Sequence, residues 1–308
     1  MPLKGILMAS KLCISFDFEL GWGVLDSALW VQREKAGWYR NLRPVLKDLF
    51  ACIKERELNT TWALVSSMLL QSNQTYETSH LRCSFAQKIH EFTANSEVQT
   101  RSALDVVDLF DGVMDHTEIA SHTATHVYPS LAGVTSAEYA TDIKLSIKHL
   151  EEYFKTPIRS VVLPRDDTAY LNKLVKVCPL NYRVNPAVYN KNKRCLKRFS
   201  PEQSRIILGQ FGETYQNGSL FFNPNPGGKM QLAKQLSFRC QLWSLLHKLR
   251  TTDEVFHVWL HPFNLVQSTQ HKEMFMHFLK TVSSLIDIGK TNTITMAELG
   301  SKTKVQIL

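Results

Sequence analysis

Short apolar segments rich in β-branched and aromatic residues alternate along this chain with longer segments of helical periodicity. The first pair is the strand-like run 11–18 (KLCISFDF), followed by the helix-like run 41–58 (NLRPVLKDLFACIKEREL). The clearest helix is predicted over 136–154, with Ser136 as its N-cap. Its apolar positions recur at three- or four-residue steps: Tyr139, Ile143, Ile147, Leu150 and Phe154. Strands that alternate with helices in this way predict a parallel α/β architecture.

The alternation continues through RSVVLP, NYRVNP, EVFHVWLHPF and TITMAEL as further strands, and only a basic, Pro- and Gly-rich region over 189–229 breaks its rhythm. No linker interrupts the pattern, so one domain is expected over residues 1–308. An open, doubly wound sheet fits the pattern almost as well. The Gly-rich G-x-G-x-x-G turn of many such sheets does not follow the first strand, however, and a barrel is favoured.

Composition narrows the class of protein. Of 308 residues, 44% are hydrophobic and 21% are charged, which is typical of a globular protein and excludes an intrinsically disordered chain. The six cysteines are scattered without a C-x-x-C pair, which favours reduced thiols. The N-terminus lacks the apolar core of a signal peptide, and no segment is long enough to span a membrane, so a cytoplasmic location is expected. The formal charge of +8 suits an anionic partner, but no nucleic-acid recognition motif is present, so nucleic acid is not expected.

Two acidic residues close the first predicted strand. Asp17 and Glu19 lie in SFDFELGWG (15–23) at alternating positions, so their side chains point to the same side of the strand. Carboxylates at the end of an apolar strand are unfavourable unless they are paired with a counter-charge or take part in binding or catalysis. A solvated strand end with ordinary acidic residues is the alternative.

Two histidines four residues apart follow another predicted strand. His122 and His126 lie in EIASHTATHVYPS (118–130), and this spacing puts both imidazoles on one side, as a shared metal requires. Thr123 stands where zincin metalloproteases have their catalytic Glu, so that motif is absent. Taken alone, the pair is better explained as two ordinary histidines.

A third segment, EVFHVWLHPFNL (254–265), ends a late strand with His261 directly before Pro262. A histidine at such a position suits general acid or base work, because its usual pKa lies near neutrality. His257 is expected to belong to the strand body. Catalytic groups of α/β barrels gather at the carboxyl ends of the strands, where all three segments lie. Together they indicate a mononuclear metal hydrolase.

These segments resemble the motifs of the polysaccharide deacetylases, also called the NodB-homology or carbohydrate esterase family 4 group. FDFE resembles the first motif, SHTATH the H-[ST]-x-x-H second motif, and WLHPFN the late histidine motif. NTTWALV (59–65), VVLPRDD (161–167) and NYRVNP (181–186) are similar to elements between them. The resemblance covers about residues 11–265. It implies a deformed (β/α) barrel of about seven parallel strands with outer helices, completed by the C-terminal helix and strand.

The resemblance implies roles for individual residues. His122 and His126 match the metal-binding histidines, Asp17 matches the general base, and the second metal-binding carboxylate falls on Glu19. The commoner family form has an acidic residue where Phe18 stands, which leaves open how Asp17 and Glu19 divide their roles.

His261 matches the general acid, and Arg165 matches the arginine that orients the catalytic carboxylate. Substrate contacts are expected from Trp22, Asp166 and Arg183. Aromatic residues after the first strand, Trp22, Trp30, Trp38 and Tyr39, either stack on a sugar ring or are buried at the barrel rim.

The expected activity is removal of an acetyl group from an N-acylated sugar or glycan. Zn²⁺ is the default metal for these ligands, with Co²⁺, Ni²⁺ and Mn²⁺ as alternatives. A formamide, a ureide or an O-acetyl ester would use the same groups, and an inactive glycan-binding relative is a further alternative. The basic segment KNKRCLKR (191–198) is expected to overhang the barrel mouth and to favour a phosphate-linked sugar as substrate.

Overall fold

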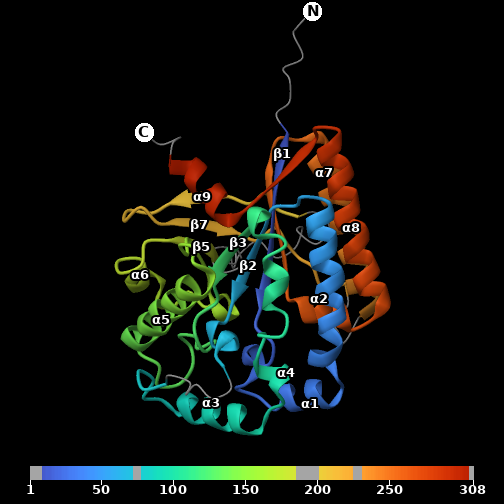
Figure 1. The fold of residues 1–308 in the computed structure, drawn as a ribbon. Coiled ribbons are helices and arrows are strands. Elements are labelled where there is room, and N and C mark those ends of the chain that lie inside the picture. Colours follow the sequence, from blue (N-terminus) through green and yellow to red (C-terminus); the bar gives the residue numbers. More distant parts are fainter. Residues whose placement is uncertain (1–8, 72–77, 185–200, 225–230, 305–308) are drawn as a thin grey trace, which may run out of the picture.

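A computed structural model describes residues 9–71, 78–184, 201–224 and 231–304 of the chain (Figure 1). The basic segment 191–198 lies outside the described residues. The described strands form a single ten-stranded sheet. They are β1 (Ser10–Phe18), β2 (Thr60–Leu64), β3 (Thr117–Ser121), β4 (Ser160–Val162), β5 (Asn181–Val184), β6 (Ile206–Leu208), β7 (Thr214–Asn217), β8 (Leu220–Phe221), β9 (Val255–Leu260) and β10 (Thr291–Ile294).

The sheet order is β6-β7-β5-β4-β3-β2-β1-β9-β8, and β10 pairs with the first half of β1 beyond this path. Every pairing is parallel except that of β6 with β7, which is antiparallel. This curved sheet with helices around it confirms the predicted deformed (β/α) barrel. The expected number of strands was too low, because three short strands, β6, β7 and β8, lie in the region 189–229 that shows no strand periodicity.

The helices cover both sides of the sheet and its two ends. They are α1 (Leu29–Lys35), α2 (Trp38–Glu55), α3 (Ser84–Asn95), α4 (Val98–Arg101), α5 (Ser136–Phe154), α6 (Leu171–Leu174), α7 (Gln231–Thr251), α8 (Thr269–Asp287) and α9 (Met296–Lys304). Figure 1 shows α2, α7 and α8 along one side, α5 and α6 along the other, and α1, α3 and α4 below the carboxyl ends of the strands. Of the helices in the described part of the chain, none combines the length and apolar character needed to cross a bilayer.

Two local expectations need correction. Helix α5 begins at Ser136, but its cap is Thr135, whose hydroxyl accepts from the Glu138 amide while the Glu138 carboxylate accepts from the Thr135 amide. The strand predicted from TITMAEL stops at Ile294, and residues from Met296 onward form α9 instead. Met296 and Leu299 of α9 are buried together with apolar side chains of β1 to β4, and Figure 1 shows α9 near the end of the sheet at which β1 begins.

An aromatic cluster packs α2 against the sheet. Trp62 of β2 is fully buried. Its ring stacks on Phe16 (centroids 4.2 Å apart) and on Phe50 of α2 (4.6 Å), and Phe110 meets it edge-on (5.3 Å). Such stacked and edge-to-face contacts add to the burial of apolar area. This aromatic cluster therefore fixes α2 against the sheet.

We expect Trp62→Ala to lower the free energy of unfolding by about 3–5 kcal/mol, because the cavity it leaves is surrounded by rigid aromatic rings. Trp243→Ala is the matched control, since Trp243 on α7 is 69% exposed and its loss should change stability by less than about 0.5 kcal/mol. Urea denaturation followed by circular dichroism measures both. Equal losses for the two variants would contradict this view of the core.

Candidate metal centre

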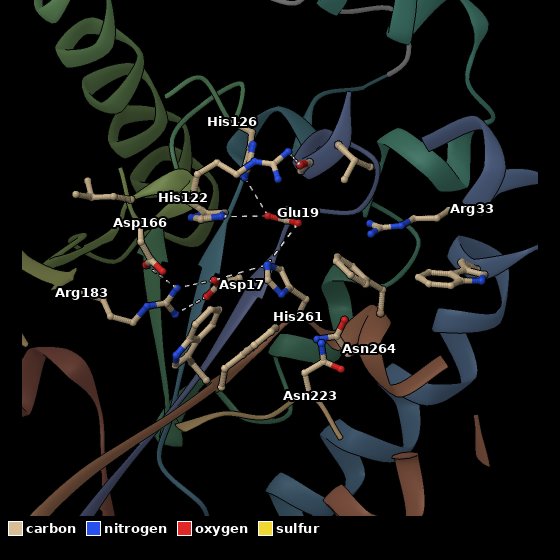
Figure 2. A pocket seen from close by; sticks show the side chains of 18 of the residues that line it. Asp17, Glu19, Arg33, His122, His126, Asp166, Arg183, Asn223, His261 and Asn264 are labelled. Atoms are coloured by element: carbon tan, nitrogen blue, oxygen red, sulfur yellow. Dashed lines mark hydrogen bonds and ion pairs between the residues drawn. The ribbon is translucent and has the colours of Figure 1, made fainter. Parts of the chain in front are cut away.

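The carboxyl ends of the strands open onto a cavity of about 470 Å³ (Figure 2). With the exception of Trp22, its wall contains all the site residues predicted from the sequence: Asp17, Glu19, His122, His126, Arg165, Asp166, Arg183 and His261. These residues lie at one end of the sheet because the carboxyl ends of parallel strands are all at the same edge.

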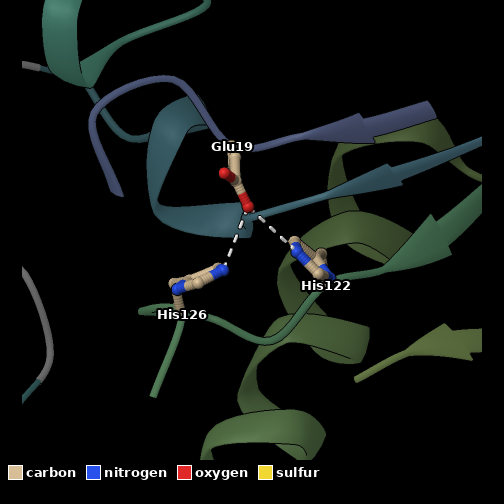
Figure 3. A group of neighbouring side chains, drawn as sticks. All are labelled: Glu19, His122 and His126. Carbon is tan, nitrogen blue, oxygen red and sulfur yellow. Dashed lines mark hydrogen bonds and ion pairs between the residues drawn. The ribbon is translucent and has the colours of Figure 1, made fainter. Parts of the chain in front are cut away.

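Three buried side chains converge in this cavity (Figure 3). Glu19 follows β1, His122 follows β3, and His126 lies four residues further along the same loop. Glu19 Oε2 is 3.2 Å from His122 Nε2 and 3.0 Å from His126 Nε2. One ligand atom from each residue lies within 4.8 Å of the others, so the three can share one ion.

The hydrogen bond of His122 fixes which of its ring nitrogens faces Glu19, in a way that is compatible with a metal between them. His122 Nδ1 lies 2.8 Å from the carbonyl oxygen of Val162. A carbonyl only accepts, so Nδ1 carries the hydrogen, and in the neutral ring Nε2 presents its lone pair to Glu19. A lone pair and a carboxylate oxygen repel unless a proton or a cation lies between them. Two imidazole nitrogens and one carboxylate oxygen form a donor set suited to Zn²⁺ and related divalent ions.

Gly23 makes room for the carboxylate of Glu19. A Cβ atom at Gly23, within the short helical turn Trp22–Val24, would lie 1.9 Å from Glu19 Oε1 and 2.1 Å from its Cδ. These separations are far below van der Waals contact. The glycine is therefore needed because the backbone passes directly beside the carboxylate.

The loop that carries both histidines has an unusual backbone. Thr123 (φ 66°) and His126 (φ 61°) both adopt the left-handed conformation, which is unfavourable above all for a β-branched residue. Asp142 of α5 is fully buried and holds the loop. It accepts from the Ala124 amide (2.8 Å), the Thr125 amide (3.2 Å) and the Thr125 hydroxyl (2.9 Å). These bonds compensate the strain and aim both rings at Glu19.

Asp17 is paired with Arg183 of β5. Arg183 Nη1 donates to Asp17 Oδ1 and Nη2 to Oδ2, each at 2.6 Å, and Trp259 covers the guanidinium at 4.4 Å. Burial by itself raises the pKa of Asp17, but the charge and hydrogen bonds of Arg183 outweigh burial and hold that pKa below its usual value. Asp17 is therefore a fixed carboxylate anion.

This pairing corrects the expected partner of Asp17. Arg165 was expected to orient Asp17, yet its Nη2 donates to the Gly23 carbonyl (3.0 Å) and to Asp26 (3.3 Å) at the rim of the cavity. Arg165 has a left-handed backbone (φ 59°) directly after Pro164, which turns its side chain outward. Arg183 lines the cavity and makes the bidentate bond to Asp17, and its contact with substrate stays a prediction. A lone arginine inside a short apolar strand was the available signal, because such a residue needs a buried acidic partner.

His261 lies between the two carboxylates of β1. Its Nε2 is 3.6 Å from Glu19 Oε1 and 3.9 Å from Asp17 Oδ2. Its ring stacks on Phe263 (4.9 Å) and meets Phe221 edge-on (5.6 Å). Aromatic walls on these sides fix the ring and leave Nε2 directed at the reaction space.

Glu19 is also held as an anion. Burial raises the pKa of Glu19. The charges of His261 and His126 and the hydrogen bonds from His122 and His126 outweigh burial and hold that pKa well below its usual value. The cavity thus contains two ionised carboxylates of different kinds. Asp17 is neutralised by an arginine, and Glu19 faces two histidines.

The remaining residues predicted to contact substrate or stack on a sugar differ in where they lie. Trp22 is fully buried away from the cavity, where its indole donates to the Arg101 carbonyl (2.8 Å) and packs edge-on against Phe92, so the burial alternative holds for it. Trp38 does line the cavity. Asp166 also lines the cavity, 3.9 Å from Arg183, and its contact with substrate stays a prediction.

We expect Gly23→Ala to lower the affinity for Zn²⁺ at least about tenfold, because the added methyl group displaces the Glu19 carboxylate. Gly112→Ala is the control, since the nearest atom to its new Cβ is Lys54 Nζ at 3.6 Å. A competition titration against a chromophoric chelator measures both affinities. Unchanged binding by Gly23→Ala would remove Glu19 from the ligand set.

No protein-family model matches the chain, and no curated protein matches it. Solved structures do match. A putative polysaccharide deacetylase from Mycobacterium smegmatis has a TM-score of 0.60 at 13% identity, over 98% of this chain and 92% of that one. The α-amylase AmyC from Thermotoga maritima reaches 0.57 at 13% identity, over 95% of this chain and 74% of that one. A GH57-type branching enzyme from Pyrococcus horikoshii has a TM-score of 0.53 at 10% identity, over 94% of this chain and 69% of that one. At such identities the likeness shows fold alone: this chain has the barrel fold of a polysaccharide deacetylase, and an amylase and a branching enzyme share it.

Proposed function

We propose that the protein is a metal-dependent hydrolase that removes an acyl group, in the first instance acetyl, from an N-acylated sugar or glycan. The observation that carries the proposal is the buried cluster of Glu19, His122 and His126 with Asp17 and His261 beside it in one cavity. The deacetylase among the structures of the same fold is consistent with this assignment.

Glu19, His122 and His126 would hold a divalent ion, with Zn²⁺ favoured and Co²⁺, Ni²⁺ or Mn²⁺ compatible with the same donors. When bound, the ion would polarise the acyl carbonyl and lower the pKa of water at the site. The backbone around Gly23 and the bonds to Asp142 keep the three ligands in place.

Asp17 would act as the general base. It is anionic, and Arg183 fixes its orientation through two hydrogen bonds. Each carboxylate oxygen has a second lone pair, so Asp17 can still accept the proton of the attacking water. The buried arginine stabilises the anion before the reaction and adjusts its basicity through charge.

His261 would act as the general acid. An amine anion is a very poor leaving group, so cleavage of an amide requires a proton at the departing nitrogen. The position of His261 Nε2 between Asp17 and Glu19 places a donor on the reaction space. A single general acid of this kind contributes typically about 10²–10⁴-fold to the rate.

Glycoside cleavage is the competing function, since an α-amylase and a branching enzyme share the fold. Glycosidases generally need one carboxylic acid that stays protonated to release the sugar, and therefore one carboxyl with a raised pKa. The pKa values of Asp17 and Glu19 are both lowered, so neither residue suits the role of that acid, whereas both suit acyl hydrolysis as anions. A formamide, a ureide or an O-acetyl ester remains compatible with the same residues.

The test is acetate release by the Zn²⁺-loaded protein from N-acetylglucosamine, its oligomers and an O-acetylated xylan. We expect His126→Ala to lose both metal and turnover. His261→Ala should keep the metal and lose at least about 10²-fold in kcat. His277→Ala, an exposed position on α8, is the control and should keep both.

Metal content by mass spectrometry separates these cases. Full activity of His261→Ala would refute the general acid. A wild-type protein that binds Zn²⁺ and glycans but releases no acid from any acylated substrate would instead be an inactive glycan-binding protein.

A further inference from the structure

The cavity has a second polar end, away from the ion pair of Asp17. Figure 2 shows Arg33 of α1 and Arg183 at opposite sides of the view, with Glu19 and His261 between them. Arg183 is bound to Asp17, and Arg165 is bound to Asp26. Arg33 differs, because no ion pair with an acidic side chain is found for it in the described part of the chain: its charge lies beside the Tyr39 hydroxyl, and its Nη1 is buried without a hydrogen-bond partner.

The guanidinium of Arg33 is nevertheless held in a defined place. It lies over the ring of Trp38 at 5.1 Å and over the ring of Phe263 at 4.6 Å. These contacts fix the plane of the group and leave its N–H edge available. A buried donor without a partner is unfavourable, so its retention in a cavity indicates that a ligand supplies the acceptor.

Asn264 provides a second unpartnered donor on the same wall. Its side chain belongs to a residue that is 4% exposed, it lines the cavity, and Nδ2 has no partner among the described residues. Asn264 directly follows Phe263, on which Arg33 rests, and its backbone amide donates to the His261 carbonyl (2.9 Å). The side-chain oxygen accepts from Gln267 (3.5 Å), which directs Nδ2 away from that contact.

We propose that Arg33 and Asn264 form an oxyanion subsite that binds a carboxylate or phosphate group carried by the acylated sugar. The inference rests on the proposed function, in which the acyl group lies at Glu19, His122 and His126. A guanidinium fork matches the paired oxygens of a carboxylate or a phosphate, and an amide N–H adds a third donor. A neutral sugar would leave the positive charge of Arg33 without an anionic partner. The substrate class is therefore an acidic N-acylated sugar.

A purely structural role for Arg33 makes a different prediction. If the guanidinium only packs between Trp38 and Phe263, its loss affects every substrate alike. Arg33→Met keeps an apolar stem and removes the N–H fork, whereas Arg33→Lys keeps the charge without the planar fork. Arg40→Met is the matched control, because Arg40 on α2 has a side chain that is 59% exposed and loses the same charge away from the cavity.

The first experiment compares three substrates with the Zn²⁺-loaded protein: N-acetylglucosamine, its 1-phosphate and the corresponding N-acetylated uronic acid. We expect KM for at least one acidic sugar to be tenfold or more below that of the neutral sugar. Arg33→Met should remove this preference by raising KM more than it lowers kcat, Arg33→Lys should keep part of it, and Arg40→Met should keep all of it. Which acidic sugar is preferred distinguishes phosphate from carboxylate.

A second measurement needs no turnover. Ligand-observed NMR with glucuronic acid and glucose, which carry no acyl group, reports on the subsite alone. Glucuronic acid should bind the wild type and His261→Ala, and binding should be at least tenfold weaker in Arg33→Met. That result supports the subsite even if no acetate is released in any assay. Acetate release with equal KM for neutral and acidic sugars, and equal binding of glucuronic acid by wild type and Arg33→Met, would overturn the subsite while leaving the proposed hydrolase intact.

Discussion

Asp17 and Glu19 place two negative charges on one face of a single strand, and both side chains are almost completely buried. An ionised carboxylate away from water is strongly unfavourable unless a counter-charge and hydrogen bonds replace its hydration. Arg183 compensates Asp17, and the two histidines of the loop after β3 surround Glu19. Strands β1, β3 and β5 therefore have to end around the same small volume.

That requirement explains the curvature of the sheet. In the strand order, β5 is separated from β1 by β4, β3 and β2. Neighbouring strands are about 4.8 Å apart, so four steps across a flat sheet would put β5 about 19 Å from β1. Arg183 reaches Asp17 at 2.6 Å only because the sheet bends back on itself and brings the two strands to face each other. The ion pair of Asp17 and Arg183 thus links two strands across the barrel and is also part of the site.

Local patterns were enough to predict which residues form the buried cluster of Glu19, His122 and His126, whereas the partners of the other site residues depend on the tertiary fold. Glu19, His122 and His126 are recognised by short spacings at strand ends. Which arginine pairs with Asp17, Arg165 or Arg183, depends on how far the sheet bends and on the left-handed backbone after Pro164. Neither feature can be predicted from residue spacing. Trp22 and Trp38 illustrate the same limit. Both are aromatic and follow the first strand. The indole of Trp22, however, donates to the Arg101 carbonyl away from the cavity, whereas Trp38 lines the cavity.

The path of the chain through the sheet also sets the order in which the site can assemble. Strand β1 lies between β2 on one side and β9 on the other, and β10 completes its first half. The bonds that tie Ser10 to Leu249 and Thr291 span 239 and 281 residues of sequence. At a ribosomal rate of about 5–20 residues per second, the latter separation corresponds to roughly 14–56 s of synthesis. Until β9 and β10 have been synthesised, β1 lacks strand partners that it has in the folded protein, and unpaired edges promote aggregation. Charged side chains such as those of Asp17 and Glu19, at the carboxyl end of an otherwise apolar strand, oppose pairing with another chain.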